Sequence, residues 1–269
     1  MRTILVTNDD GLDAPGLRVL AEGLKALGRV VVVAPEQDMS AVSHALTLTR
    51  PLRVRRHAED IHSVDGTPTD CVNLGVFTLL SKKVDLVVSG INRGYNLGDD
   101  ITYSGTVSAA FEGTLLGYPS IAISRAREDR AGFSGSNWPH DAEDGYNLAA
   151  AFAVDLARRV LDEGMPQDTL LNVNVPLPPV QAVRCTRLGK RRYTEGVIER
   201  VDPAGRRYFW IGGTPPEWVD DERSDYAAVR CGCVSVTPLH LDLTNDRQMQ
   251  EIMSWKLALP AGADGRGSG

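Results

Sequence analysis

The sequence predicts an α/β fold, in which a mostly parallel, Rossmann-like sheet carries helices on both faces. Apolar, β-branched runs alternate with segments of helical spacing through residues 4–176, and this alternation is typical of parallel sheets. The run VVVVA at 30–34 is apolar throughout, as in a strand buried on both faces. Polar residues follow several of these runs, at the sheet edge where ligands bind in such folds.

The first elements set the pattern. A strand at 4–7 is followed by a helix that Pro15 opens and that Gly28 is predicted to cap. Within this helix, apolar residues recur at the spacing of one helical face, at Leu17, Leu20, Ala21, Leu24 and Leu27. A second strand at 30–34 ends at Pro35, and residues 36–64 predict a loop that runs into extended segments. The later spacing predicts helices at 69–80, 106–116 and 147–161 and strands at 84–90, 120–124 and 170–176.

The chain changes in character after Pro176. Basic residues gather at 187–196, aromatic residues at 206–213, and residues 233–244 alternate in strand fashion. We therefore interpret residues 1–180 as an α/β catalytic core. Residues 181–256 are interpreted as hairpins and an extended arm, which packs on the core or on a neighbouring subunit and serves oligomerisation. Residues 257–269 have the composition of a disordered tail.

Composition narrows the function classes. A net charge of −6 over 269 residues argues against a nucleic-acid duplex as partner, although a metal ion could supply positive charge at a site for one phosphate. The sequence has no apolar stretch of ~18 residues, so no membrane partner is expected. The four cysteines lack the spacing of a zinc site and indicate a reduced, cytoplasmic protein.

Two adjacent acids, Asp9 and Asp10, follow the first strand, and Gly11 permits a sharp turn. A turning backbone can aim both carboxylates at one point, where they repel each other unless a cation lies between them. A hard divalent cation such as Mg²⁺ or Mn²⁺ prefers such oxygen ligands. The other interpretation is that these acids cap the following helix, and this stretch alone leaves both open.

The loop after the second buried strand contains Ser40, Ser43 and His44. The Ser40 hydroxyl could serve as a neutral oxygen ligand. His44 could donate a proton to a leaving group or hold a phosphate. A lone histidine is also often a surface residue or one with an ordinary hydrogen bond, and that interpretation stays open here.

A third polar segment follows the strand predicted at 84–90. It supplies the amide oxygens of Asn92 and Asn96, and it ends in hydroxyl-bearing and small residues at a helix start, Ser104, Gly105 and Thr106. A helix N-terminus with free N–H groups is an anion site, although ordinary capping would explain the same residues.

These polar segments together favour metal-assisted hydrolysis of a phosphate ester, in which water attacks directly. The chain has neither a P-loop motif nor a G-x-G-x-x-G motif after its first strand.

The chain resembles the SurE family of survival protein E nucleotidases. Seven stretches support the resemblance, namely ILVTNDDG, VVAPEQDMSAVSHALT, GTPTDCV, VDLVVSGINRGYNLGDDITYSGTVSAAFEG, PSIAIS, LLNVNVP and VSVTPLHLDLT. The resemblance implies a three-layer α/β/α core and an exchanged arm that builds homodimers or homotetramers. It also implies hydrolysis of nucleoside 5′- or 3′-monophosphates with one divalent cation per subunit, Mg²⁺ or Mn²⁺.

The resemblance also implies roles for residues. The metal ligands would be Asp9, Asp10, Ser40 and Asn92, of which Asp9, Asp10 and Asn92 would be catalytic. One of the two acids would also orient or deprotonate the attacking water. Substrate and phosphate contacts are expected from Asn8, Ser43, His44, Asn96, Ser104, Gly105 and Thr106. The family often has Gly before the histidine, whereas this chain has Ser43.

Two other functions are compatible with the same residues. One is a broader phosphatase that cleaves short polyphosphate, which depends on pocket shape. The other is a nucleotide-binding protein without turnover, which the intact set of candidate ligands argues against.

Overall fold

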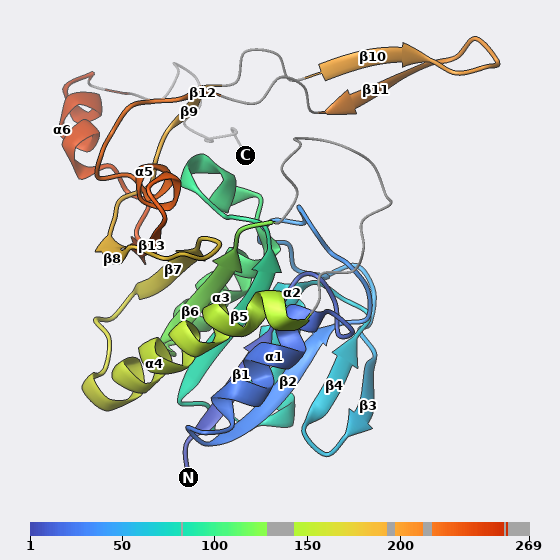
Figure 1. Cartoon of the computed structure of the whole chain (residues 1–269). Coiled ribbons are helices and arrows are strands. Elements are labelled where there is room, and N and C mark those ends of the chain that lie inside the picture. Colours follow the sequence, from blue (N-terminus) through green and yellow to red (C-terminus); the bar gives the residue numbers. More distant parts are fainter. Residues whose placement is uncertain (82, 128–142, 193–196, 212–216, 256, 258–269) are drawn as a thin grey trace, which may run out of the picture.

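A nine-stranded sheet forms the centre of the molecule (Figure 1). The computed structural model describes residues 1–269 except 82, 128–142, 193–196, 212–216, 256 and 258–269, so the predicted tail lies almost wholly outside the described residues. The strand order is β3-β4-β2-β1-β5-β6-β7-β13-β8. These strands are β1 Thr3–Thr7, β2 Arg29–Pro35, β3 Val54–Ala58, β4 Ile61–Val64, β5 Leu86–Arg93, β6 Ser120–Arg125, β7 Thr169–Val175, β8 Ala182–Cys185 and β13 Cys233–His240.

The sheet is mostly parallel, as predicted. Strands β4, β2, β1, β5, β6 and β7 run parallel, whereas β3 pairs antiparallel with β4 and β13 antiparallel with β7. The carboxyl ends of the parallel strands therefore lie at one edge, from which the predicted polar segments leave.

Helices cover both faces of the sheet. They are α1 Pro15–Leu24, α2 Pro68–Leu74, α3 Gly105–Leu115, α4 Asn147–Glu163 and α5 Asp225–Arg230. Helix α6 Asp246–Ser254 buries no residue and lies away from the sheet (Figure 1). A π-helical turn Gly75–Leu79 extends α2, and 3-10 turns occupy Gly98–Thr102 and Glu143–Tyr146.

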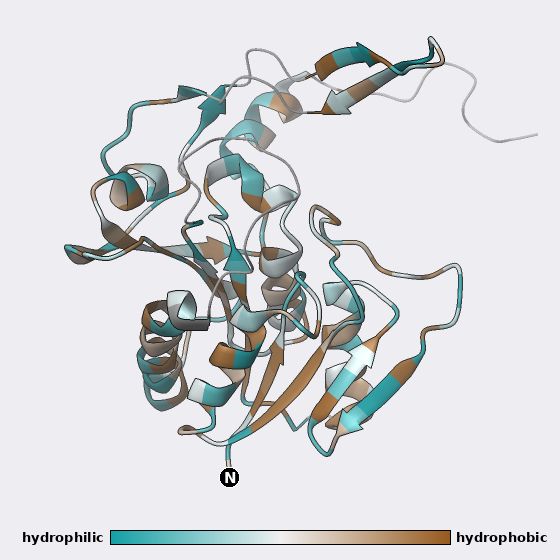
Figure 2. Ribbon diagram, turned by 45° about the vertical axis from the view of Figure 1, so that its right-hand side comes forward, coloured by the Kyte–Doolittle hydropathy of each residue, from teal (hydrophilic) through white to brown (hydrophobic). Residues whose placement is uncertain are grey.

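Alternation along the strands explains the two covered faces. On β1, Ile4 and Val6 pack with the core beneath α1 and α4, whereas Leu5 packs with the core beneath α2. Side chains of successive strand residues point to opposite faces, so a run that is apolar throughout needs helices on both sides. The central strands are accordingly the most hydrophobic ribbons in Figure 2. The α/β/α prediction is confirmed.

One predicted helix end is wrong. Helix α1 ends at Leu24, with Lys25 at its C-cap, and not at Gly28. The backbone then tightens, with N–H groups of residues 25–27 donating to carbonyls three residues earlier. Gly28 instead lies against the Arg2 carbonyl, 2.4 Å from where a Cβ would stand, so its small size permits the approach of β1 and β2.

The C-terminal segment divides between the sheet and a projecting hairpin. Strands β8 and β13 extend the main sheet, and Leu239 on β13 packs beneath α3. Strands β10 Val197–Val201 and β11 Arg207–Ile211 form a separate antiparallel hairpin that projects from the body (Figure 1). The short strands β9 Arg191–Arg192 and β12 Glu217–Trp218 pair with each other.

Among the described residues, no helix has both the length and the apolar character needed to span a membrane. The four cysteines are free thiols, with Cys71 and Cys233 buried and Cys185 and Cys231 exposed.

We predict that Gly113→Ala destabilises the fold by about 1–3 kcal/mol, because overpacking outweighs the gain in helix propensity. A Cβ on Gly113 would stand 2.5 Å from Ser120 Oγ and 2.9 Å from Val87 Cβ, where α3 meets the sheet. Urea unfolding measures the loss. Gly23→Ala is the matched control, because its Cβ would meet only a Val154 methyl at 3.1 Å. Equal stability of both variants would contradict this packing.

Candidate active site

A buried side chain stabilises the turn after β1. Asn8 is fully buried, and its Nδ2 donates to the Gly11 carbonyl at 2.9 Å. Gly11 has φ +94°, a left-handed conformation that favours glycine. Asn8 is thus placed behind the turn, while Asp9 and Asp10 stand at its top.

The two acids do not cap the next helix. The N-cap of α1 is Ala14, which makes no side-chain capping bond. This helix-capping interpretation of Asp9 and Asp10, which the sequence left open, therefore has no counterpart in the structure.

Asp9 lies against the N-terminus of α3. Thr106 Oγ1 donates to Asp9 Oδ1 in a short hydrogen bond. A Cβ on Gly105 would lie 2.8 Å from Asp9 Cβ, so only glycine permits this approach. Ser104 is the N-cap, accepting from Val107 N at 3.1 Å. The three predicted anion-site residues are therefore placed beside the predicted acids.

Asp10 faces the end of β5. Its Oδ2 accepts from the Arg93 backbone N–H at 3.3 Å, which places the neighbouring Asn92 at the same point. The Nδ2 of Asn92 donates to the Gly94 carbonyl at 2.9 Å, so the amide oxygen is the group that this side chain can offer to a cation.

The loop after β2 brings Ser40 to the same edge. The Met39 N–H donates to the Asp9 carbonyl at 2.8 Å. Asp38 Oδ1 accepts both the Ser40 backbone N–H at 2.7 Å and the Ser40 hydroxyl at 2.6 Å. Because the Ser40 proton is held by Asp38, the lone pairs of its oxygen remain for another partner. Sequence reasoning missed Asp38, although an acid two residues before a serine is typical of such local turns.

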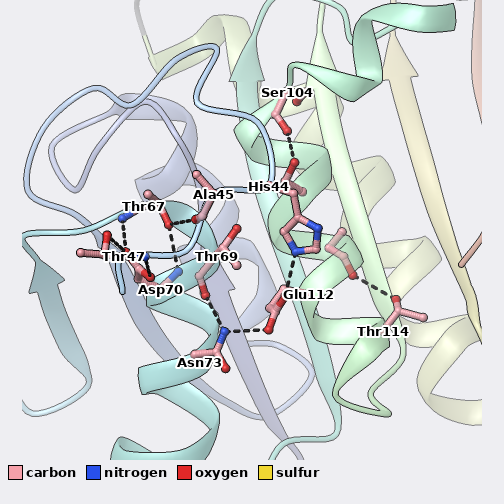
Figure 3. A network of polar contacts seen from close by, with 12 residues as sticks. His44, Ala45, Thr47, Thr67, Thr69, Asp70, Asn73, Ser104, Glu112 and Thr114 are labelled. Atoms are coloured by element: carbon pink, nitrogen blue, oxygen red, sulfur yellow. Dashed lines mark hydrogen bonds and ion pairs between the residues drawn. The ribbon is translucent and has the colours of Figure 1, made fainter. Parts of the chain in front are cut away.

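Ser43 and His44 attach this loop to α3. Ser43 takes a left-handed φ of +58°. Its N–H donates to the Tyr103 carbonyl at 3.1 Å, and its hydroxyl donates to the Thr102 carbonyl at 2.6 Å. The His44 ring is half-buried, and its Nε2 lies 2.8 Å from Oε2 of Glu112, which sequence reasoning also missed (Figure 3).

Asn96 is placed differently from the other candidates. It is buried, its Nδ2 donates to Ser124 Oγ at 2.8 Å, and its backbone bonds Asn172 and Asn174 on β7. In this structure its side chain faces the strands behind the loop.

The electrostatics of the site are those of crowded acids. Burial raises the pKa of Asp9, and the Asp38 charge adds to this effect. Burial, followed by repulsion from Asp9, raises the pKa of Asp10 to about 7. Two neighbouring carboxyl groups with raised pKa values indicate that the site lacks positive charge to balance them when they ionise.

The donor set is suited to a hard cation. The candidate ligands are two carboxylates, one hydroxyl and one amide oxygen, and oxygen donors are what Mg²⁺ and Mn²⁺ prefer. Within the described ranges, no group of three or more His, Cys, Asp or Glu side chains is arranged to hold a metal. A cation here would therefore need the neutral oxygens of Ser40 and Asn92 as well as the acids.

Comparisons with known proteins agree on one family. The family model described as "Survival protein SurE" matches residues 4–195. The 5′-nucleotidase SurE of Geobacter sulfurreducens is 54% identical over 269 residues, covering 99% of this chain and 98% of that protein. The 5′-nucleotidase SurE of Geotalea uraniireducens is 54% identical over 257 residues, covering 94% and 99%. The crystal structure of the SurE protein from Aquifex aeolicus superposes with a TM-score of 0.81 at 48% identity, covering 95% of this chain and 100% of that one.

We predict that Asp10→Asn stabilises the metal-free protein at pH 8. Between the unfolded value of about 4 and about 7, the folded state keeps a proton that the unfolded state loses. The contribution of Asp10 to stability therefore falls as the pH rises through this window, and the variant avoids the loss. Urea unfolding in EDTA at pH 5 and pH 8 should show a larger gain at pH 8. Asp13→Asn, at an exposed acid in the same loop, is the control, and an equal gain at both pH values would be the contrary result.

Proposed function

The chain belongs to the SurE family and is a 5′-nucleotidase, and from that premise we propose that it uses one divalent cation per subunit to hydrolyse nucleoside 5′-monophosphates to nucleoside and phosphate. Nucleoside 3′-monophosphates are a second substrate class that we propose for the same site. The observation that supports the metal most directly is the pair of crowded acids, whose raised pKa values indicate a deficit of positive charge.

We assign the cation, Mg²⁺ or Mn²⁺, to Asp9, Asp10, Ser40 and Asn92. The hydrogen bonds described above orient three of these groups. Thr106 holds Asp9, Asp38 holds the Ser40 proton, and Gly94 holds the Asn92 amide. When bound, the cation would lower the pKa of a coordinated water and neutralise charge on the phosphoryl oxygens.

The start of α3 is the proposed cradle for the phosphate group. Helix α3 has 11 residues, and its first N–H groups carry the partial positive charge of a helix N-terminus. Gly105 has no side chain to obstruct an approaching anion, and Ser104 and Thr106 add hydroxyls. Thr106 donates to Asp9, so the same residue would link the phosphate cradle to the proposed metal ligands. One of the two acids would accept the proton of the attacking water.

The test is phosphate release from AMP with Mg²⁺, with Mn²⁺ and after treatment with EDTA. We expect release only with metal, and we expect Asp9→Asn and Asn92→Ala each to lower kcat by roughly 100-fold or more, the scale typical of lost transition-state stabilisation. Titration calorimetry with Mn²⁺ should show weakened binding in both variants. Asp155→Asn, at an exposed position on α4, serves as the control.

Three results would contradict parts of this assignment. Near-normal rates in both variants would show that the metal ligands are wrong. Release from short polyphosphate but not from AMP or 3′-AMP would favour the broader phosphatase. Unchanged AMP affinity in EDTA, with no phosphate released under any condition, would favour a binding protein without turnover.

We also propose that the hairpin β10–β11 builds a homodimer or homotetramer. Its apolar residues are exposed, with Phe209 56%, Trp210 64% and Ile211 92% accessible. An isolated two-stranded hairpin is at best marginally stable in water, so contact with a second copy would supply the burial that this hairpin lacks.

Light scattering after size exclusion tests the assembly. The wild type should be a dimer or tetramer, and the double variant Phe209→Asp, Ile211→Asp should be smaller, because two charges cannot be buried without partners. Leu115→Asp, at a position on α3 that is 57% exposed, should leave the assembly intact. A monomeric wild type, or an unchanged double variant, would rule out this role of the hairpin.

A further inference from the structure

A buried acid lies next to the proposed site and has no role in it. Glu112 is on α3, two turns after the proposed phosphate cradle, and is only 7% exposed. Acidic side chains are rarely this buried unless they are paired and hydrogen-bonded. We therefore examine which groups pair with the Glu112 carboxylate and what this pairing does.

Both carboxylate oxygens of Glu112 are occupied (Figure 3). Oε2 lies 2.8 Å from His44 Nε2, and Oε1 accepts from Asn73 Nδ2 at 2.7 Å. Asn73 in turn donates to the Thr69 carbonyl at 3.2 Å. A continuous hydrogen-bonded chain thus runs from α2 through α3 to the loop that contains Ser40.

The hydrogen bonds of Glu112 determine which nitrogen of His44 bears a proton. Burial alone raises the pKa of Glu112, as does the Asp70 charge on α2, but the bonds from His44 and Asn73 outweigh them and hold the pKa below its ordinary value. An ionised carboxylate can only accept, so His44 Nε2 must carry the hydrogen. The nitrogen that does not bond Glu112 is then Nδ1, which lies on the other side of the ring from Glu112 (Figure 3).

The loop that carries His44 is attached directly before the proposed phosphate cradle. The preceding residue, Ser43, donates its N–H to the Tyr103 carbonyl, and Tyr103 directly precedes the N-cap Ser104. The histidine is also four residues from Ser40 along the same loop. Its ring is 35% exposed, so a bound substrate can reach it.

We propose that Glu112, held by Asn73, is a positioning residue that keeps Nε2 of His44 bonded and presents Nδ1 to the leaving nucleoside oxygen. This role rests on the proposed function. A base or acid that a third group orients is a recurring arrangement in hydrolases. Here Glu112 would set both the tautomer and the direction of the ring, as carboxylates do for other functional histidines.

The proposed step balances in protons. Water attacks phosphorus, the bond from phosphorus to the nucleoside oxygen breaks, and the Nδ1 proton of doubly protonated His44 moves to that oxygen. One proton of the attacking water stays on the released phosphate. The other is accepted by one of the two acids and passes from it through solvent to His44, so both groups are restored and the net reaction is ester plus water to nucleoside plus phosphate.

A purely structural role makes a different prediction. If the contact between His44 and Glu112 only holds the loop, its loss lowers the hydrolysis of all substrates alike. If His44 protonates the leaving group, the loss depends on how much that group needs a proton. The alkoxide of a nucleoside needs one, whereas p-nitrophenolate leaves readily as an anion.

The experiment compares kcat for AMP and for p-nitrophenyl phosphate with Mn²⁺ in His44→Gln, Glu112→Gln and the double variant. With AMP we expect losses of roughly 100-fold for His44→Gln and on the order of tenfold for Glu112→Gln, because the bonded shape survives without its charge. The losses with p-nitrophenyl phosphate should be at least several-fold smaller. The double variant should match His44→Gln, since the two residues act as one unit. Glu22→Gln, an exposed residue on α1, is the matched control.

Equal losses with the two substrates, or additive losses in the double variant, would overturn the proposal in favour of a structural contact. If Glu112→Gln fails to fold, Asn73→Ala tests the positioning role instead, because it removes the second bond that holds Glu112, and it should show the same smaller loss with p-nitrophenyl phosphate than with AMP. A wild type that releases phosphate from neither substrate would instead contradict the proposed function, and this role with it.

Discussion

The contact between Asp9 and the N-terminus of α3 is the interaction on which the rest of the site depends. Asp9 accepts from Thr106 through its side chain and from Met39 through its backbone carbonyl. One residue thus joins the end of β1, the loop after β2 and the start of α3. Gly105 permits the approach, since a Cβ there would meet Asp9 at 2.8 Å. This contact therefore fixes the position of the proposed metal ligands relative to the phosphate cradle.

Burial of neighbouring acids creates the electrostatic demand of the site, and the hydrogen bond from Thr106 to Asp9 offsets only part of it. Asp9, Asp10 and Asp38 are acids at one sheet edge, and burial raises the pKa of the first two. A helix N-terminus offers only about half a positive charge, too little to balance two ionised carboxylates. The overall charge of −6 gives no general compensation. A site built in this way has a reason to bind a cation before it binds an anionic substrate.

The sequence predicted well what depends on local pattern. Strand periodicity identified the buried strands of the parallel sheet, and their carboxyl ends located Asp9, Ser40 and Asn92 at one edge. It predicted poorly what depends on distant contacts. The sequence pattern predicts Gly28 as a helix cap, but its small size is needed for the close contact with Arg2. Glu112 lies in a helix of small and apolar residues, and only its bonds to His44 and Asn73, 68 and 39 residues away, explain why a charge can be buried there.

Ser43 illustrates how tertiary contacts can replace a residue that local geometry prefers. Ser43 stands where the resemblance to the SurE family leads us to expect glycine, and it adopts the left-handed conformation, with φ +58°. For a residue with a side chain this conformation costs on the order of 1 kcal/mol or more. The two bonds from Ser43 to the Thr102 and Tyr103 carbonyls each return about 0.5–1.5 kcal/mol, and glycine could make only one of them. The serine therefore keeps the glycine-like backbone path while attaching the loop to the turn before α3, and that attachment places His44 within reach of Glu112.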